Sequence, residues 1–273
     1  MTQLERGDFN GDGKLDLLAV EYATGKLWLY PGNATGANIG DGAARVELGS
    51  GGWAKMTGLA AGDFNGDGRT DLAAIDSSTR MLWVYPNNGQ LSSIANPLTR
   101  IEAGGGGWHV MNDPTSGDFN GDGKADLLVV DSTTGKLWVY PGTNQPAGLG
   151  NATTRVEAGG GGWTKMNDPS SGDFNGDGKA DLLVVDTSTG KLWVYPGTNQ
   201  PANLGNVTTR IEAGRGGWTK MYDLTGGDFN HDGRSDLVVV DDNSGELWLY
   251  PGTNQAANLG NPDTRILVGR AGW

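Results

Sequence analysis

The sequence has no cysteine among its 273 residues, which excludes disulfides and thiolate metal sites. It also has no apolar run close to the ~18 residues of a membrane helix, so we expect no membrane span. The opening segment, MTQLERGDFN, lacks the apolar stretch of a secretory signal. Positive charge is scarce, with 20 Lys and Arg against 32 Asp and Glu and a net charge of −12. Because nucleic-acid binding needs clustered Lys and Arg, we expect no nucleic-acid partner.

Catalytic groups are equally scarce. The two histidines, His109 and His231, occupy unrelated places in the sequence pattern, and no nucleophile motif is present. Outside one class of acidic loop, described below, we expect no pair of carboxylates. Catalysis needs unlike groups gathered in one site, and the chain repeats like groups instead. The sequence therefore predicts that this protein is not an enzyme.

What the sequence has is an internal repeat of 55 residues, marked by a GDFN motif. The aspartate of this motif recurs at Asp8, Asp63, Asp118, Asp173 and Asp228. Met1 is in register with Met56, so the chain starts inside a repeat, as a cut or a tandem duplication would leave it. We predict one domain, 1–273, made of repeats 1–53, 54–108, 109–163, 164–218 and 219–273.

Each repeat is predicted to form four antiparallel strands. In the third copy TSGDFN is a short strand, DLLVVD (126–131) is a continuous apolar run typical of a buried strand, and KLWVYPG (136–142) follows as its hairpin partner. TTRVEAG (153–159) alternates as an outer strand would. These strands leave no room for a substantial helix.

A single sheet of this kind leaves two apolar faces exposed to water, so the copies must pack face to face. A ring of 4–8 blades achieves this, whereas an open stack needs polar capping units, which neither end of the chain provides. The sequence therefore predicts an all-β fold, a five-bladed β-propeller of four-stranded antiparallel blades. We expect each blade to come from one repeat, the fifth to meet the first by packing, and the protein to be a monomer.

The acidic loop of each repeat predicts a metal site. In DFNGDGKAD (118–126) oxygen-bearing side chains occupy the first, third, fifth and ninth places, and the seventh residue can offer its carbonyl. Three carboxylates so close repel one another unless a cation lies between them. A hard ion with 6–8 oxygen ligands in flexible geometry fits, which predicts Ca²⁺, about five ions in all. The twelfth place lies within a strand, so, unlike in an EF-hand, the bidentate role passes to the ninth.

The predicted calcium ligands, the seventh of each loop acting through its backbone carbonyl, are Asp8, Asn10, Asp12, Lys14, Asp16, Asp63, Asn65, Asp67, Arg69, Asp71, Asp118, Asn120, Asp122, Lys124, Asp126, Asp173, Asn175, Asp177, Lys179, Asp181, Asp228, Asn230, Asp232, Arg234 and Asp236.

The motif DFNGDGxxDLLVVD followed by KLWVYPG resembles the FG-GAP or VCBS repeat of integrin-like β-propellers. The resemblance covers essentially the whole chain. It implies a secreted propeller with calcium loops, in a class that includes integrin heads, domains of secreted enzymes, and lectins that hold glycans between neighbouring blades. Five blades is fewer than the seven typical of integrins, so ligand details are not transferred.

Each repeat carries two tryptophans with different expected roles. Those of the LWxY strands are expected to fill the space between blades; they are Trp28, Trp83, Trp138, Trp193 and Trp248. Those after the glycine-rich stretches are predicted as platforms for sugar rings, or alternatively as seals between adjacent blades; they are Trp53, Trp108, Trp163, Trp218 and Trp273.

These features together predict a calcium-stabilised, lectin-like propeller with up to five equivalent glycan sites and an extracellular location. Its expected partners are glycans or glycoconjugates. A non-catalytic protein-interaction or adhesion scaffold, which could be a duplicated or engineered repeat protein, is the alternative reading. A polysaccharide-active enzyme is less favoured.

Overall fold

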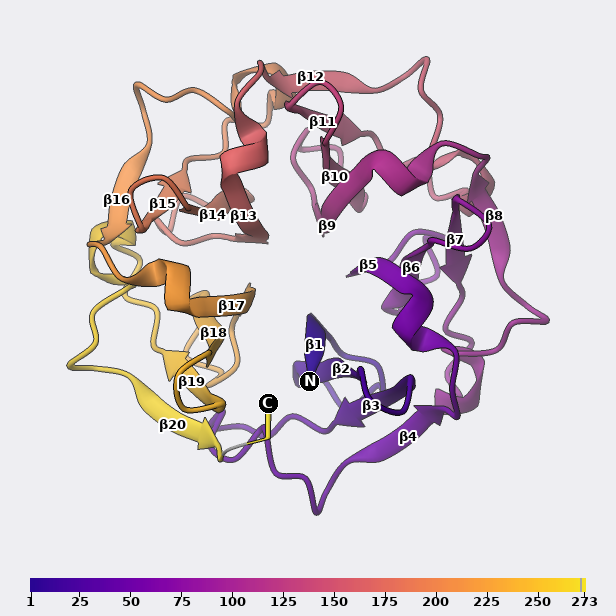
Figure 1. Ribbon diagram of the computed structural model, residues 1–273, viewed down its shortest axis with the longest axis horizontal. Coiled ribbons are helices and arrows are strands. Elements are labelled where there is room, and N and C mark those ends of the chain that lie inside the picture. Colours follow the sequence, from indigo (N-terminus) through magenta and orange to yellow (C-terminus); the bar gives the residue numbers. More distant parts are fainter. Residues whose placement is uncertain (271) are drawn as a thin grey trace.

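In a computed structural model, which describes residues 1–270 and 272–273, five sheets are arranged in a ring (Figure 1). Each sheet has four antiparallel strands, and its strands are neighbours in sequence order. The innermost strands β1, β5, β9, β13 and β17 line the centre of the ring (Figure 1). The predicted five-bladed β-propeller is confirmed.

The bounds of the strands follow, blade by blade. They are β1 (Thr2–Gly7), β2 (Asp16–Glu21), β3 (Lys26–Tyr30) and β4 (Val46–Gly49); β5 (Met56–Gly62), β6 (Asp71–Asp76), β7 (Met81–Tyr85) and β8 (Ile101–Gly104); β9 (Met111–Gly117), β10 (Asp126–Asp131), β11 (Lys136–Tyr140) and β12 (Val156–Gly159); β13 (Met166–Gly172), β14 (Asp181–Asp186), β15 (Lys191–Tyr195) and β16 (Ile211–Gly214); β17 (Met221–Gly227), β18 (Asp236–Asp241), β19 (Glu246–Tyr250) and β20 (Ile266–Gly269).

The helices of the described residues are single 3₁₀ turns of two kinds. One kind begins at the tryptophan that follows each glycine-rich stretch: η1 (Trp53–Lys55), η3 (Trp108–Val110), η5 (Trp163–Lys165) and η7 (Trp218–Lys220). The other kind follows the third strand of a blade: η2 (Leu91–Ser93), η4 (Pro146–Gly148), η6 (Pro201–Asn203) and η8 (Ala256–Asn258).

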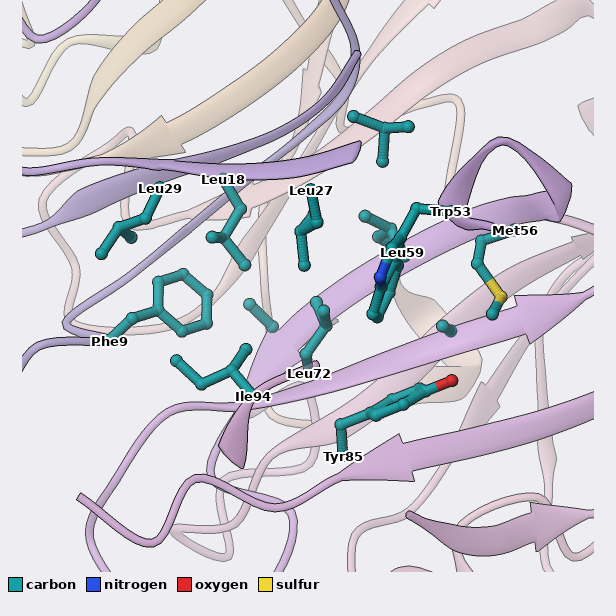
Figure 2. Packing of buried hydrophobic residues seen from close by; sticks show 13 residues of the cluster. Phe9, Leu18, Leu27, Leu29, Trp53, Met56, Leu59, Leu72, Tyr85 and Ile94 are labelled. Carbon is teal, nitrogen blue, oxygen red and sulfur yellow. The ribbon is translucent and has the colours of Figure 1, made fainter. Parts of the chain in front are cut away.

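The core lies between the blades. Successive side chains of a strand point to opposite faces, so the apolar run of β10 serves two neighbours. Leu127 and Val129 pack toward the second blade, whereas Leu128 and Val130 pack toward the fourth. Figure 2 shows the equivalent cluster between the first and second blades, where Leu27, Trp53 and Leu72 meet. Each blade is therefore an apolar wedge covered on both faces.

The ring closes by packing between the fifth and first blades. Leu4 and Ile39 of the first blade join Phe229 and Leu249 of the fifth in one buried cluster. Because the first and fifth sheets share no strand, no β-ladder fastens this junction. This agrees with the expected closure.

Candidate calcium loops and interblade clefts

The acidic loop of the third blade connects β9 to β10 and is folded by its own side chains. Oδ1 of Asp118 accepts hydrogen bonds from the backbone N–H groups of Gly121 (2.7 Å) and Asp122 (3.0 Å), and Oδ2 accepts one from Gly123 (2.9 Å). Gly123 has a φ of 80°, which a glycine adopts without strain. The sequence DFNGDG thus wraps backbone donors around the first aspartate.

Asp126 anchors the same loop from inside, with no exposed surface. Its Oδ2 accepts the N–H groups of Phe119 (3.0 Å) and Asn120 (3.2 Å), and its Oδ1 accepts the Asn120 side-chain amide (3.2 Å) and the Gly142 N–H (2.8 Å). No lysine or arginine pairs with it among the described residues. Burial raises the pKa of Asp126 to about 6, because the charged form loses its hydration, and the nearby Asp122 charge adds to the rise.

The other four loops repeat this arrangement. Burial raises the pKa of the ninth residue to about 6 in each of them, at Asp16, Asp71, Asp181 and Asp236.

Asp122 lies on the outer side of the loop, paired with Lys124 at 2.9 Å. That hydrogen bond holds its pKa below the usual range. Across the residues described, no three acidic or histidine side chains converge on one point. The donor set still suits a hard cation, since Oδ2 of Asp118 and Oδ1 of Asn120 each accept one hydrogen bond and keep a free lone pair. Four N–H groups contact the two carboxylate oxygens of Asp126, and the bidentate role of the ninth residue stays a prediction.

The tryptophans of the glycine-rich loops are buried, not open platforms. Trp163 is 6% exposed, and its ring centroid lies 5.1 Å from that of Tyr195 in the next blade. A Cβ atom at Gly159 would lie 2.1 Å from Nε1 of Trp163, which explains the glycine at this point. Figure 2 shows the same pairing for Trp53 and Tyr85. The seal between blades, the alternative role, is the one this geometry supports.

The other four members of this set follow the same rule with one difference. Trp53, Trp108 and Trp218 are buried, whereas Trp273 is half-buried and 4.5 Å from Tyr30.

The LWxY tryptophans, expected in the core, are only half-buried. Trp138 lies on the outer part of its blade, with the guanidinium of Arg155 stacked 3.9 Å from its ring. The same guanidinium donates a hydrogen bond of 3.1 Å to the Tyr140 hydroxyl. The strand tryptophans thus pack partly against the clusters between blades, as expected, and partly beneath arginine. The loop tryptophans fill the wedges, which is the second of the two roles predicted for them.

A cleft of about 660 Å³ lies between the fourth and fifth blades. Trp218 and Tyr250 line its aromatic inner part, and Arg215, Asn258 and Arg265 are among its polar lining. One wall is the glycine-rich loop of the fourth blade, and the other is η8 with the segment after it in the fifth. This combination of aromatic surface with amide and guanidinium donors is suited to a polar ligand with an apolar face.

A second cleft, of about 490 Å³, lies at the ring closure between the fifth and first blades. It has the same plan, with Tyr30 and Trp273 lining it together with Asn38, Arg45 and Arg270. The two clefts thus use equivalent positions of different repeats. Repetition of one plan in adjacent blades makes these clefts the candidate ligand sites.

A small cavity among the innermost strands, called the central channel here, is lined by carboxylates that the sequence did not lead us to expect. The N–H of Asp223 donates to Oδ1 of Asp168 (3.1 Å), and the N–H of Gln3 donates to Oδ1 of Asp223 (2.8 Å). Burial raises the pKa of Asp168 to about 7 and that of Asp223 to about 6, with mutual repulsion adding to the first. The expectation of no carboxylate pair outside the loops is therefore wrong.

A signal for this cluster exists in the sequence. An aspartate, at Asp113, Asp168 and Asp223, stands four residues before the last glycine of each inner strand in the third to fifth repeats. The cavity they line is about 80 Å³, room for two or three waters at ~30 Å³ each, which is too small for a sugar ring.

The fold defines the protein as a five-bladed β-propeller built from one repeated blade. The FG-GAP-like repeat model matches residues 8–74, 63–129, 118–184 and 173–239. The chain belongs to the FG-GAP-like repeat family. No curated protein matches the chain. In the part of the chain that the structure describes, no helix has the length and apolar character to cross a membrane.

Solved structures similar to this chain include one reported under the de novo evolutionary emergence of a symmetrical protein, with a TM-score of 0.67, 15% identity and 94% coverage of both chains. Another is an Agrocybe aegerita lectin that recognises non-reducing terminal N-acetylglucosamine, with a TM-score of 0.49, 18% identity and coverage of 94% of this chain and 65% of that one. A nidogen/laminin complex gives a TM-score of 0.49 at 14% identity, covering 97% and 82%. At 15% identity, the first of these structures shows likeness of fold alone.

Proposed function

We propose that this protein is a calcium-stabilised, carbohydrate-binding propeller, a lectin-like monomer in which residues 1–273 act as one domain. Glycans or glycoconjugates would be held in the clefts between blades. The observation that carries the proposal is the recurrence of one cleft plan, aromatic within and polar at the rim, in neighbouring blade junctions. Sugars present an apolar C–H face and polar hydroxyls, which such a cleft can satisfy together.

Calcium is part of the proposal because a buried carboxylate recurs in every loop without a cationic partner. In the third loop, Asp118, Asn120, Asp122 and the carbonyl of Lys124 would supply ligands, and Asp126 would join after releasing the Asn120 side chain. To bind calcium, the Asp122 carboxylate would also have to leave its ion pair with Lys124. Calcium would neutralise the loop and so stabilise the folded form that contains it.

In this proposal the loop tryptophans are not the platforms for sugar rings that the sequence suggests. Trp218 and Trp273 line the clefts, but Trp218 packs against Tyr250 and is only 6% exposed, so it offers little surface to a sugar. We therefore assign ligand contact to the cleft as a whole, with its amides and guanidinium groups, and assign the tryptophans mainly to holding its shape.

Equivalent clefts around a ring also favour multivalent binding. Several weak sites on one rigid particle raise the avidity for a surface that displays many copies of a glycan. A calcium affinity in the range of extracellular modules, about 10⁻⁴–10⁻³ M, would fit an extracellular location, which we include in the proposal.

Calorimetric titration of the calcium-saturated protein with oligosaccharides tests the function. We expect Ala257→Trp, which puts an indole into the cleft between the fourth and fifth blades, to remove binding at that cleft and lower the stoichiometry. Ala23→Trp, the same substitution at an exposed residue of the turn between β2 and β3, is the control and should leave binding unchanged. No heat and no response on a broad glycan array with the wild-type protein would refute carbohydrate binding.

A further inference from the structure

The two clefts share a residue that distinguishes their glycine-rich loops from the rest. The residue directly after the outer strand is Arg215 in the fourth blade and Arg270 in the fifth. The equivalent residue is Ser50, Gly105 or Gly160 in the other blades. Both arginines are exposed, and each lines a cleft. The repeats thus differ by a positive charge at the wall of the candidate ligand site.

These two guanidinium groups are also free of ion pairs within the described part of the chain. The arginines on the opposite walls are engaged: Arg265 lies 3.9 Å from Asp241, and Arg45 lies 3.7 Å from Glu21. Arg265 also stacks on Trp248 at 4.0 Å. A fork of unengaged N–H donors is suited to a planar or tetrahedral anion, which it can bind through two hydrogen bonds at once.

Each cleft is also lined by an acidic residue, which affects the net charge of that cleft. Glu212, beside Arg215, is neutralised by Lys191 at 2.6 Å. Asp41, in the cleft of Arg270, accepts only the Ala43 N–H (2.9 Å) and so offsets part of the positive charge there. The cleft between the fourth and fifth blades is therefore the more favourable site for an anion.

We propose that these two clefts select acidic sugars, in which a carboxylate or sulfate group is bound by Arg215 or Arg270. This inference rests on the proposed carbohydrate binding and names its ligand class. The negative net charge of the chain, −12, would oppose an anion at long range. Five bound calcium ions would reduce it to −2, so we expect acidic sugars to bind only the calcium-loaded protein.

The test is calorimetric titration of the calcium-saturated protein with three probes: a hyaluronan oligosaccharide (carboxylate), a chondroitin sulfate oligosaccharide (carboxylate and sulfate), and a neutral chito-oligosaccharide of equal length. We expect Arg215→Gly to weaken acidic-sugar binding at its cleft about tenfold or more, as loss of a charged hydrogen bond does, and to weaken neutral-sugar binding less, so that the preference for acidic sugars falls. Glycine is the residue of two sibling loops, so the fold accommodates it. Arg270→Ser, which installs the residue found at the equivalent position Ser50, should weaken acidic-sugar binding less.

The matched control is Arg80→Gly, which removes the same charge from an exposed turn and installs the glycine found at the equivalent Gly135. Binding of acidic sugars should be unchanged in this variant. The reverse substitution, Gly160→Arg, introduces an arginine at the equivalent position of the third repeat and should add an acidic-sugar site.

The outcomes separate the two proposals. Neutral sugars that bind while Arg215→Gly and Arg270→Ser leave acidic-sugar affinity unaltered would overturn the acidic selectivity and leave the carbohydrate function standing. A parallel affinity loss in Arg80→Gly would also overturn it, because net charge alone would then explain the effect. Failure of the wild-type protein to bind any of the probes or any array glycan would overturn both.

Discussion

Removal of a single glycine-loop tryptophan should destabilise the ring substantially. Trp163 is 6% exposed, packs within a buried cluster shared by the third and fourth blades, and pairs with Tyr195 at 5.1 Å. Truncation of a buried aromatic to alanine costs about 3–5 kcal/mol, which includes about 0.5–1.5 kcal/mol for the aromatic pair. We expect Trp163→Ala to fall at the lower end, near 3 kcal/mol, because the surrounding glycine-rich loop is exposed and can relax.

The assay is urea unfolding at saturating calcium, followed by far-UV circular dichroism so that the lost indole does not alter the signal. Trp273→Ala should cost less, since its side chain is half-buried. Leu98→Ala, at a residue 91% exposed, is the control and should change stability by about 0.5 kcal/mol or less. If Trp163→Ala lowers the free energy of unfolding by less than 1 kcal/mol, the sealing role is refuted and the role of this tryptophan as a platform for a ligand is favoured instead.

Three further outcomes follow from the loops, the channel and the blade junctions. Excess chelator should lower the melting temperature by several degrees or more, and Asp126→Asn should reduce this calcium-dependent difference in a scanning fluorimetry experiment. At saturating calcium, Asp168, whose folded-state pKa is about 7 against an ordinary 3.8, contributes stability at acid pH that is lost as pH rises through 7. Asp168→Asn should therefore raise the melting temperature at pH 8 relative to the wild type and not at pH 4, and an equal effect at both would contradict the assignment. Gly159→Ala should destabilise, because its Cβ meets the Trp163 ring, and a loss in the double variant with Trp163→Ala that is smaller than the sum of the two single losses would identify that clash.

The fold could be predicted because each level of the sequence agrees with the next. The apolar run at 126–131 lies in a strand buried on both faces, and the repeat supplies the neighbour for each face. The position of the metal loops follows from the same register. The hydrogen bonds of the loop side chains could not be predicted, because the spacing of oxygen-bearing residues does not show which backbone N–H groups bind Asp126.

The burial of the two tryptophan sets could be predicted only in part. Trp138 packs against the core between blades, as expected of a strand tryptophan, but its outer side is covered by an arginine 17 residues later in the sequence, whose stacking the strand pattern does not reveal. For the tryptophan after four glycines the sequence left a platform and a seal open, and Gly159 favours the seal because it lacks the side chain that would keep the ring out of the wedge. The clefts depend on pairs of loops from different repeats, so only the closed ring makes them visible.

A crystal structure of the calcium-saturated protein in complex with an oligosaccharide is the most direct test of the proposed function. We expect a sugar ring between the glycine-rich loop of the fourth blade and η8 with the segment after it in the fifth, within reach of Arg215 and Asn258, and metal density in the acidic loops. Sugar bound on the outer strands or in the central channel, with the clefts filled by solvent, would contradict it.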